Sequence, residues 1–240
     1  MFRRKRFINP RDFSIDRPAL SRPDIDSPSF SYVENMSYKS LTFNQLKDRF
    51  GLQPSISPIF TNTKIISLEP SKWLWRTLEI ASHNAVKTKK ERSERIISPI
   101  LLESLERNNR QFSIFSGWQF DVDIDRGLNG ECDFLLSGVP FDLEIQVPFF
   151  ALTEAKGGKI ETGLSQCAAQ MVAAQIFNER KNNPMPVIFG CVTTGIVWRF
   201  LKLKSKDLII DADVYYLDNV PVILGVLQII VDLYKNKISH

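Results

Sequence analysis

Histidine and cysteine are scarce in this chain of 240 residues. There are two histidines, His83 and His240, and three cysteines, Cys132, Cys167 and Cys191. The cysteines are far apart, odd in number and set among apolar residues, which is typical of reduced core residues in a cytoplasmic protein and fits no zinc site. Two histidines argue against a histidine-rich metal cage and against most histidine-based catalysis. We therefore expect any chemistry to depend on carboxylates, lysine and amides.

Long apolar runs are also lacking. No stretch reaches the roughly 18 apolar residues that a membrane span needs, and the most apolar one, 220–231, is interrupted by Pro221, Gly225 and Gln228. The N-terminal Met-Phe-Arg-Arg-Lys-Arg is not followed by the apolar segment of a secretory signal. We expect a cytoplasmic protein with no membrane partner.

Charge of one sign is not in large excess. The chain has 31 Lys and Arg against 27 Asp and Glu, a net charge of +4, and 43% of its residues are hydrophobic. This composition excludes a disordered chain and a collagen-like repeat. The length suits one sizeable domain with an extension, or two small domains.

Proline divides the chain near residue 70. Seven of the thirteen prolines lie before residue 71, and each fixes φ and removes a backbone donor. We predict a Pro-rich N-terminal extension over residues 1–70, with short elements such as a helix over Leu41–Phe50, and a main domain over residues 71–240.

The main domain alternates between helical and strand-like patterns. Helices are expected at Ser71–Ala85, Thr88–Asn108, Gly163–Lys181 and Val222–Lys235. Strands are expected at Phe112–Phe115, Trp118–Ile124, Glu131–Ser137, Phe141–Val147, Phe149–Ala155, Pro186–Thr193, Ile196–Leu203 and Val214–Leu217. This order predicts an α/β domain with a mixed central sheet flanked by helices on both faces.

Two of the strand-like segments carry charged residues in apolar surroundings. Strand alternation places Glu131 and Asp133 on one face of the first segment, and Glu154 and Lys156 on one face of the second. An unpaired charge there would be costly, and a divalent cation held by Asp133, Glu154 and the Ala155 carbonyl would remove the cost. Mg²⁺ prefers such oxygen ligands, and Lys156 could hold the attacking water. The pattern predicts metal-assisted phosphodiester hydrolysis, with Mg²⁺ or Mn²⁺ as the cofactor.

The alternative for Glu154 and Lys156 is a surface salt bridge at a strand end. The triplet has little specificity by itself, because Glu179-Arg180-Lys181 matches it too. Glu131 and Glu144 are further ligand candidates, and a solvated strand face is the alternative for both.

The predicted helix before these strands carries an acidic candidate. Glu94, Ile97, Leu101 and Leu105 recur at helical spacing. Glu94 is therefore expected on the core-facing stripe of this helix, where it would face the cleft that holds the two carboxylates.

A basic run lies just before Glu94. It consists of Lys87, Lys89, Lys90 and Arg92. We expect these side chains to flank the mouth of the cleft and to contact nucleic-acid phosphates. A solvated helix face is the alternative interpretation.

The order of these residues resembles the PD-(D/E)XK nuclease superfamily, which has the restriction-endonuclease-like fold. The resemblance is greatest to the N-terminal nuclease domain of type I restriction enzyme R subunits, and it covers roughly residues 76–204. The matching segments are Glu94 to Leu102, Cys132 to Leu136, Leu152 to Lys156, Gln166 to Gln170 and Val192 to Phe200.

The resemblance implies a role for each matching residue. Asp133 and Glu154 would be metal ligands, and Lys156 would be the catalytic lysine. Glu94 would be the helix carboxylate, and Gln170, on a helix with exposed glutamines, would lie near the scissile phosphate. The chain would then be a Mg²⁺- or Mn²⁺-dependent nuclease that cleaves DNA, as a standalone domain, a homodimer or part of a larger nuclease assembly.

The chain also departs from the family pattern. Cys132 stands where many members have proline, the gap between Asp133 and Glu154 includes an extra segment, and Ala174 replaces the usual aromatic residue after Gln170. The alternative function is a non-catalytic DNA-binding or assembly module that keeps the nuclease fold.

Overall fold

The computed structural model describes residues 36–61, 63–140 and 148–238. They belong to one compact unit that starts at Asn35. The predicted strand Phe141–Val147, the ligand candidate Glu144 and most of the Pro-rich segment lie outside the described residues.

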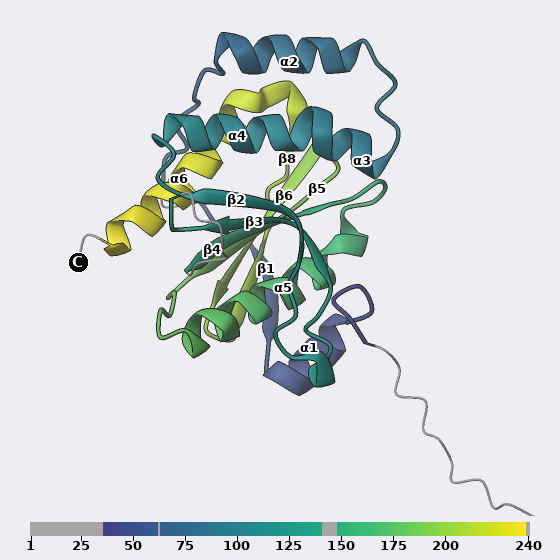
Figure 1. Cartoon of the computed structure of the whole chain (residues 1–240), viewed down its shortest axis with the longest axis vertical. Coiled ribbons are helices and arrows are strands. Elements are labelled where there is room, and N and C mark those ends of the chain that lie inside the picture. Colours follow the sequence, from purple (N-terminus) through teal and green to yellow (C-terminus); the bar gives the residue numbers. More distant parts are fainter. Residues whose placement is uncertain (1–35, 62, 141–147, 239–240) are drawn as a thin grey trace, which may run out of the picture. The chain divides into compact units, whose positions relative to one another are not determined.

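A mixed sheet of eight strands forms the middle layer (Figure 1). The strands lie in the order β1 (Gln53–Ser57), β7 (Asp207–Asp211), β6 (Val197–Lys204), β5 (Ile188–Thr193), β4 (Phe149–Ala155), β3 (Glu131–Ser137) and β2 (Ser113–Gln119), and β8 (Tyr215–Tyr216) pairs with β6. β4 pairs with β5, and β1 with β7, in parallel, while the other pairs are antiparallel. The parallel β4–β5 pair needs a crossover, which α5 (Glu161–Arg180) supplies.

Helices cover both faces of this sheet (Figure 1). α5 and α1 (Phe43–Phe50) lie on one face. α4 (Ser98–Arg107) and α6 (Val220–Ile238) lie on the other, with α2 (Lys72–Ser82) outside α4. The α/β class and the mixed central sheet between helices are therefore confirmed.

The helix before β2 contains an irregular turn. α3 (Lys89–Arg92) leads into a π-helical turn at Ser93–Ile97 and then into α4. Short 3₁₀ turns occur at Ile124–Arg126 and Leu217–Asn219. The helix predicted over Thr88–Asn108 is thus present but is not a uniform α-helix.

Helix starts follow local capping signals. The side chains of Thr42, Ser71 and Thr88 each accept a hydrogen bond from a backbone N–H three residues later, at the starts of α1, α2 and α3. Thr42 and Thr88 form complete capping boxes with Gln45 and Glu91. These short-range bonds explain why the sequence located the three starts within two residues.

The strands with the charged candidates have the predicted bounds, whereas their neighbour β2 does not. β2 joins two predicted strands and ends at Gln119 instead of continuing to Ile124. The reason is local, because Asp123 caps the 3₁₀ turn that follows by accepting a hydrogen bond from Arg126 N, and Gly127 ends it at φ +83°.

β1 changes the expected domain boundary. It lies in the Pro-rich segment, yet it pairs with β7 at the edge of the sheet. An edge strand tolerates Pro54 because one side of the strand forms no hydrogen bonds with another strand, so the missing N–H of proline is not needed there. Described residues before 71 therefore belong to the same unit as the main domain, which begins at Asn35 rather than at residue 71.

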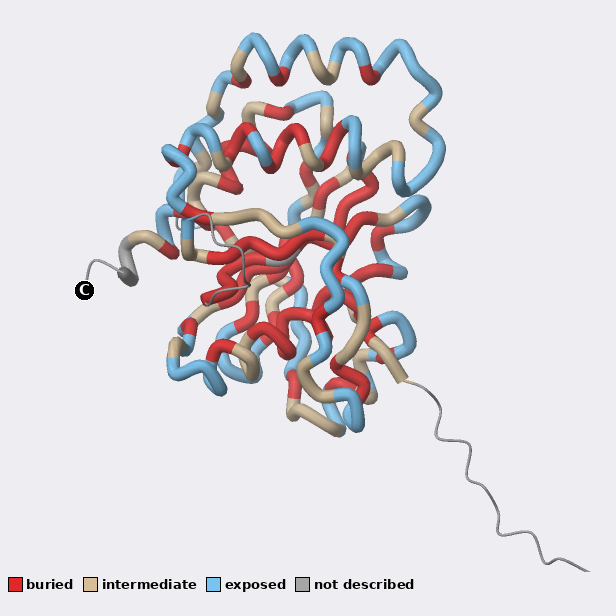
Figure 2. The backbone as a smooth tube through the Cα atoms, viewed as in Figure 1, coloured by how far each residue is buried: buried red, intermediate tan, exposed pale blue. Residues whose placement is uncertain are grey.

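The core lies between the sheet and the helices on both of its faces (Figure 2). It includes Trp198 and the free thiols of all three cysteines, which are buried as expected. The segment Leu217–Lys235 is long and apolar enough to cross a membrane, but half of that window is buried inside the domain. Its residues Ile223 and Leu224 are in the core, so α6 serves as a core helix.

Candidate active site

Asp133 and Glu154 come from the neighbouring strands β3 and β4. The antiparallel register pairs Phe134 with Thr153, and its continuation sets Asp133 opposite Glu154, on the same face of the sheet. The Glu154 side chain is 0% exposed, and that of Asp133 is 11% exposed. The structure thus brings together the two carboxylates that the sequence assigned to one metal.

The ammonium group of Lys89 lies between these carboxylates. Its Nζ is 2.7 Å from Asp133 Oδ1 and 4.0 Å from Glu154 Oε1. Burial lowers the pKa of Lys89, but the hydrogen bond to Asp133 and the two carboxylate charges outweigh burial and raise it. Lys89 is therefore a charged member of the site.

Lys156 follows β4 and turns back beside Glu154. Its Nζ is 3.1 Å from Glu154 Oε1 and donates a hydrogen bond of 2.7 Å to Gln166 Oε1. The side chain is 19% exposed and passes over Gly163 in α5, where an added Cβ would lie 2.6 Å from Lys156 Cε. The absence of a side chain at Gly163 therefore lets the lysine reach Gln166.

A backbone contact orients Asp133. Its Oδ2 accepts a hydrogen bond of 2.8 Å from Ala155 N. The N–H and C=O groups of one strand residue point to the same side of the strand, so the Ala155 carbonyl also points towards the side of Asp133. The Ala155 peptide is therefore adjacent to Asp133, and its carbonyl is directed to the side of β4 on which β3 lies.

The glutamines of α5 are buried, and the expectation that they are exposed was wrong. Gln166 and Gln170 are 3% and 1% exposed, because this side of the helix packs on the sheet. Gln170 Nε2 donates a hydrogen bond of 2.9 Å to Glu154 Oε2. Gln170 therefore orients the Glu154 carboxylate from α5.

Burial dominates the electrostatics of Glu154. It raises the pKa of this carboxyl to about 7, together with the charge of Asp133. The charges of Lys156 and Lys89 and the hydrogen bond from Gln170 act in the opposite direction. Glu154 Oε1 accepts no hydrogen bond from any described residue, although Lys156 Nζ is close to it.

Glu94 does not lie on the core-facing stripe, so that prediction was wrong. Its side chain is 60% exposed, and its Oε1 is 3.8 Å from Lys90 Nζ. The π-helical turn that contains Glu94 has a longer period than an α-helix. The α-helical period therefore does not apply between Glu94 and the buried Ile97, and the two side chains point in different directions.

An open hollow of about 460 Å³ gives access to the site. Its lining consists of Lys89, Lys90, Ser93, Glu94, Ser116, Gly117, Glu131, Asp133 and Phe134. Glu94 thus lies at the approach to Asp133, and the ligand candidate Glu131 is exposed in the wall. An extended polyanion could reach Asp133 through this opening.

The basic run divides into inward and outward side chains. Lys87 and Lys90 are exposed, whereas Lys89 turns to the carboxylates. Arg92 Nη1 donates a hydrogen bond of 3.2 Å to the Thr194 carbonyl. Two of the four predicted phosphate contacts, Lys87 and Lys90, are therefore exposed to a ligand, although Lys90 also pairs with the exposed Glu94.

The sequence predicted no role in the site for Gln166, and it predicted that Lys89 contacts phosphates rather than the carboxylates. Gln166 is four residues before Gln170, which puts both on one side of a helix, and this spacing could have identified it. Lys89 has no distinguishing local signal, because three other cations surround it in the sequence.

The residues present are suited to a magnesium-type cation. Within residues 36–61, 63–140 and 148–238, no three His, Cys, Asp or Glu side chains form a group that could hold a metal ion. Mg²⁺ is commonly bound through one or two carboxylates, with water in its other positions. The carboxylate pair and the Ala155 carbonyl meet this smaller requirement, and Glu154 Oε1 accepts no hydrogen bond from the described residues.

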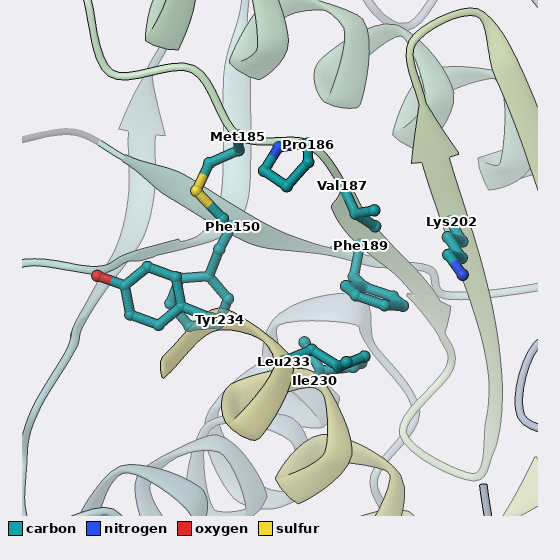
Figure 3. Close-up of a pocket in the computed structure, with 9 residues that line it drawn as sticks. All are labelled: Phe150, Met185, Pro186, Val187, Phe189, Lys202, Ile230, Leu233 and Tyr234. Carbon is teal, nitrogen blue, oxygen red and sulfur yellow. The ribbon is translucent and has the colours of Figure 1, made fainter. Parts of the chain in front are cut away.

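A second pocket lies on the opposite face of the sheet and has different chemistry (Figure 3). It has a volume of about 200 Å³. It is lined by Phe150, Met185, Pro186, Val187, Phe189, Lys202, Ile230, Leu233 and Tyr234. It contains no carboxylate, and none of the residues of the candidate site lines it.

Comparisons with known proteins assign no family to this chain. No protein-family model matches it, and no curated protein matches it. The functional inference therefore depends on the geometry of the site.

Proposed function

We propose that this chain is a metal-dependent nuclease with a restriction-endonuclease-like core, which hydrolyses DNA phosphodiester bonds in the cytoplasm. One observation carries the proposal: the buried Glu154 lies beside Asp133, with Lys156 Nζ 3.1 Å from its Oε1. The order of a helix, the Asp133 strand, the Glu154 strand and a glutamine-bearing helix also supports it.

Each residue of the site has a role in this reaction. Asp133, Glu154 and the Ala155 carbonyl would hold Mg²⁺ or Mn²⁺. A bound cation would polarise the phosphoryl oxygen and lower the pKa of the attacking water. Lys156 would donate a hydrogen bond to that water, and Gln166 fixes the amine by accepting its hydrogen bond of 2.7 Å.

The full chain should cleave DNA in Mg²⁺ or Mn²⁺ and should not cleave it in EDTA. Asp133→Asn removes one negative ligand and should lower the rate about 100-fold or more. Plasmid and labelled-oligonucleotide cleavage would measure both effects. Glu179→Gln is the matched control, because it alters the exposed second acid-x-Lys triplet and should cleave like the wild type. If the folded wild type cleaves DNA in neither Mg²⁺ nor Mn²⁺, the nuclease proposal is contradicted.

A non-catalytic DNA-binding or assembly module is the second candidate, and the position of Lys89 favours it. The Lys89 ammonium already neutralises charge between Asp133 and Glu154, so the site needs no metal for electrostatic balance. DNA binding that is equal in Mg²⁺ and EDTA, without cleavage in either, would support this module over the nuclease.

Both functions predict that Lys87 and Lys90 contact phosphates. The double variant Lys87→Ala/Lys90→Ala should weaken DNA binding about equally across sequences and reduce the slope of log K against log salt by roughly 2. Fluorescence anisotropy at several KCl concentrations would measure the slope. Lys181→Ala, at the far end of α5, is the control. If the slope of the double variant equals that of the wild type, the basic run is only a solvated surface.

A further inference from the structure

We propose that Lys89 is an internal counter-ion that occupies the cation position between Asp133 and Glu154 and must be displaced when a divalent cation binds. The inference rests on the proposed function, because it concerns the regulation of the same site. It assigns to Lys89 a role in metal binding, whereas the sequence indicated only phosphate contact.

The contacts identify the cation position. Lys89 Nζ is within 2.7 Å of Asp133 Oδ1 and 4.0 Å of Glu154 Oε1. The second oxygen belongs to a fully buried side chain and accepts no hydrogen bond from the described residues, and Lys156 Nζ lies 3.1 Å from it. Lys89 is the ammonium that approaches both carboxylates, whereas Lys156 approaches Glu154. A buried carboxylate oxygen without a hydrogen-bond partner requires a nearby cation, and a divalent ion bound to the same two oxygens would repel the ammonium.

The two lysines of the site differ in how firmly they are held. Lys156 is 19% exposed and donates a hydrogen bond to the buried Gln166. Lys89 is 43% exposed, belongs to a helix of four residues and lines the open hollow. Its long, flexible side chain can therefore move into the hollow without disturbing the core.

Displacement would also change the charge that a substrate meets. With Lys89 in place, two carboxylates and two ammonium groups balance. After a divalent cation enters, the site carries excess positive charge, and the Lys89 ammonium lies in the hollow with Lys90, where the two positive charges offset those of Glu94 and Glu131. That arrangement favours a phosphate anion, so metal binding would prepare the hollow for the substrate.

Mn²⁺ binding to the full chain tests this role directly. The free Mn²⁺ signal in electron paramagnetic resonance gives the dissociation constant for the wild type, Lys89→Met and Lys90→Met. Lys89→Met removes the competing charge and keeps the length of the side chain, so Mn²⁺ should bind about 10-fold more tightly. Lys90→Met removes the same charge from the same hollow without a contact to Asp133 or Glu154, and should change the constant much less.

Thermal unfolding provides a second measurement that does not depend on cleavage. In EDTA, Lys89→Met leaves the carboxylates without their shared ammonium and should melt below Lys90→Met. Added Mn²⁺ should raise its melting temperature more than that of the wild type. Circular dichroism checks that each variant is folded. If Lys89→Met does not fold, Lys89→Gln is used in its place.

The outcomes separate this inference from the nuclease proposal. If the wild type binds Mn²⁺ and cleaves DNA but Lys89→Met binds no more tightly, the role of Lys89 is refuted and the nuclease stands. If Lys89→Met binds Mn²⁺ and cleaves while the wild type does neither, Lys89 holds the enzyme inactive. If no variant binds Mn²⁺, both proposals fail.

Discussion

Lys156→Met is expected to abolish DNA cleavage while the protein remains folded and still binds DNA. The substitution removes the ammonium that lies 3.1 Å from Glu154 Oε1 and donates to Gln166. In the proposed reaction this ammonium holds the attacking water, so we expect the rate to fall about 100-fold or more. Single-turnover cleavage measures the rate, and anisotropy measures DNA binding separately.

Methionine is a better replacement than alanine at this position. A lysine at an exposed strand end would pack little, and Lys156→Ala would then leave folding intact. The side chain is instead 19% exposed and lies against Gly163. Lys156→Ala would therefore remove packing as well as charge, whereas methionine keeps most of the contact and isolates the charge.

Gly163→Ala tests the position of the lysine without removing any polar group. The added Cβ would lie 2.6 Å from Lys156 Cε and 2.7 Å from a methyl group of Val192. The lysine must move away, so cleavage should fall although every predicted catalytic residue is present. If Lys156→Met or Gly163→Ala cleaves at the wild-type rate, Lys156 does not position the water.

Glu154→Gln should stabilise the metal-free protein increasingly as the pH rises from 5 to 8. Burial, together with the charge of Asp133, raises the pKa of Glu154 to about 7 in the folded protein, above its ordinary value of 4.5. Between these two values the folded state binds more protons than the unfolded state, so the free energy of unfolding of the wild type decreases with increasing pH. Glutamine does not ionise, so the free energy of unfolding of Glu154→Gln lacks this decrease with pH.

The free energy of unfolding of Glu154→Gln, relative to that of the wild type, should increase by about 3 kcal/mol at most between pH 5 and pH 8. Urea unfolding in EDTA at pH 5, 6, 7 and 8 would measure it. Glu106→Gln is the control, because Arg110 lowers the pKa of the exposed Glu106 carboxyl and its titration lies below this range. A constant difference between Glu154→Gln and the wild type would show that Glu154 does not ionise in this window.

Local patterns in the sequence determined the elements that carry the two carboxylates. Alternation of apolar and polar residues located β3 and β4 with their correct bounds, and it set Glu154 and Lys156 on one face. Such signals are reliable because a strand has a fixed period of two and a capping bond spans only three residues. The α/β class follows from the order of the same elements.

Contacts between distant segments decided the rest. β1 became part of the sheet because β7, far along the chain, offers it a parallel edge, which no local pattern predicts. Glu94 is exposed because a π-helical turn interrupts the helical period. Among four neighbouring cations, only the docking of α3 near the ends of β3 and β4 determines that Lys89 reaches Asp133. The physical reason is that local sequence specifies backbone periodicity, whereas the path of a long, flexible side chain depends on which charges the tertiary fold brings within its reach.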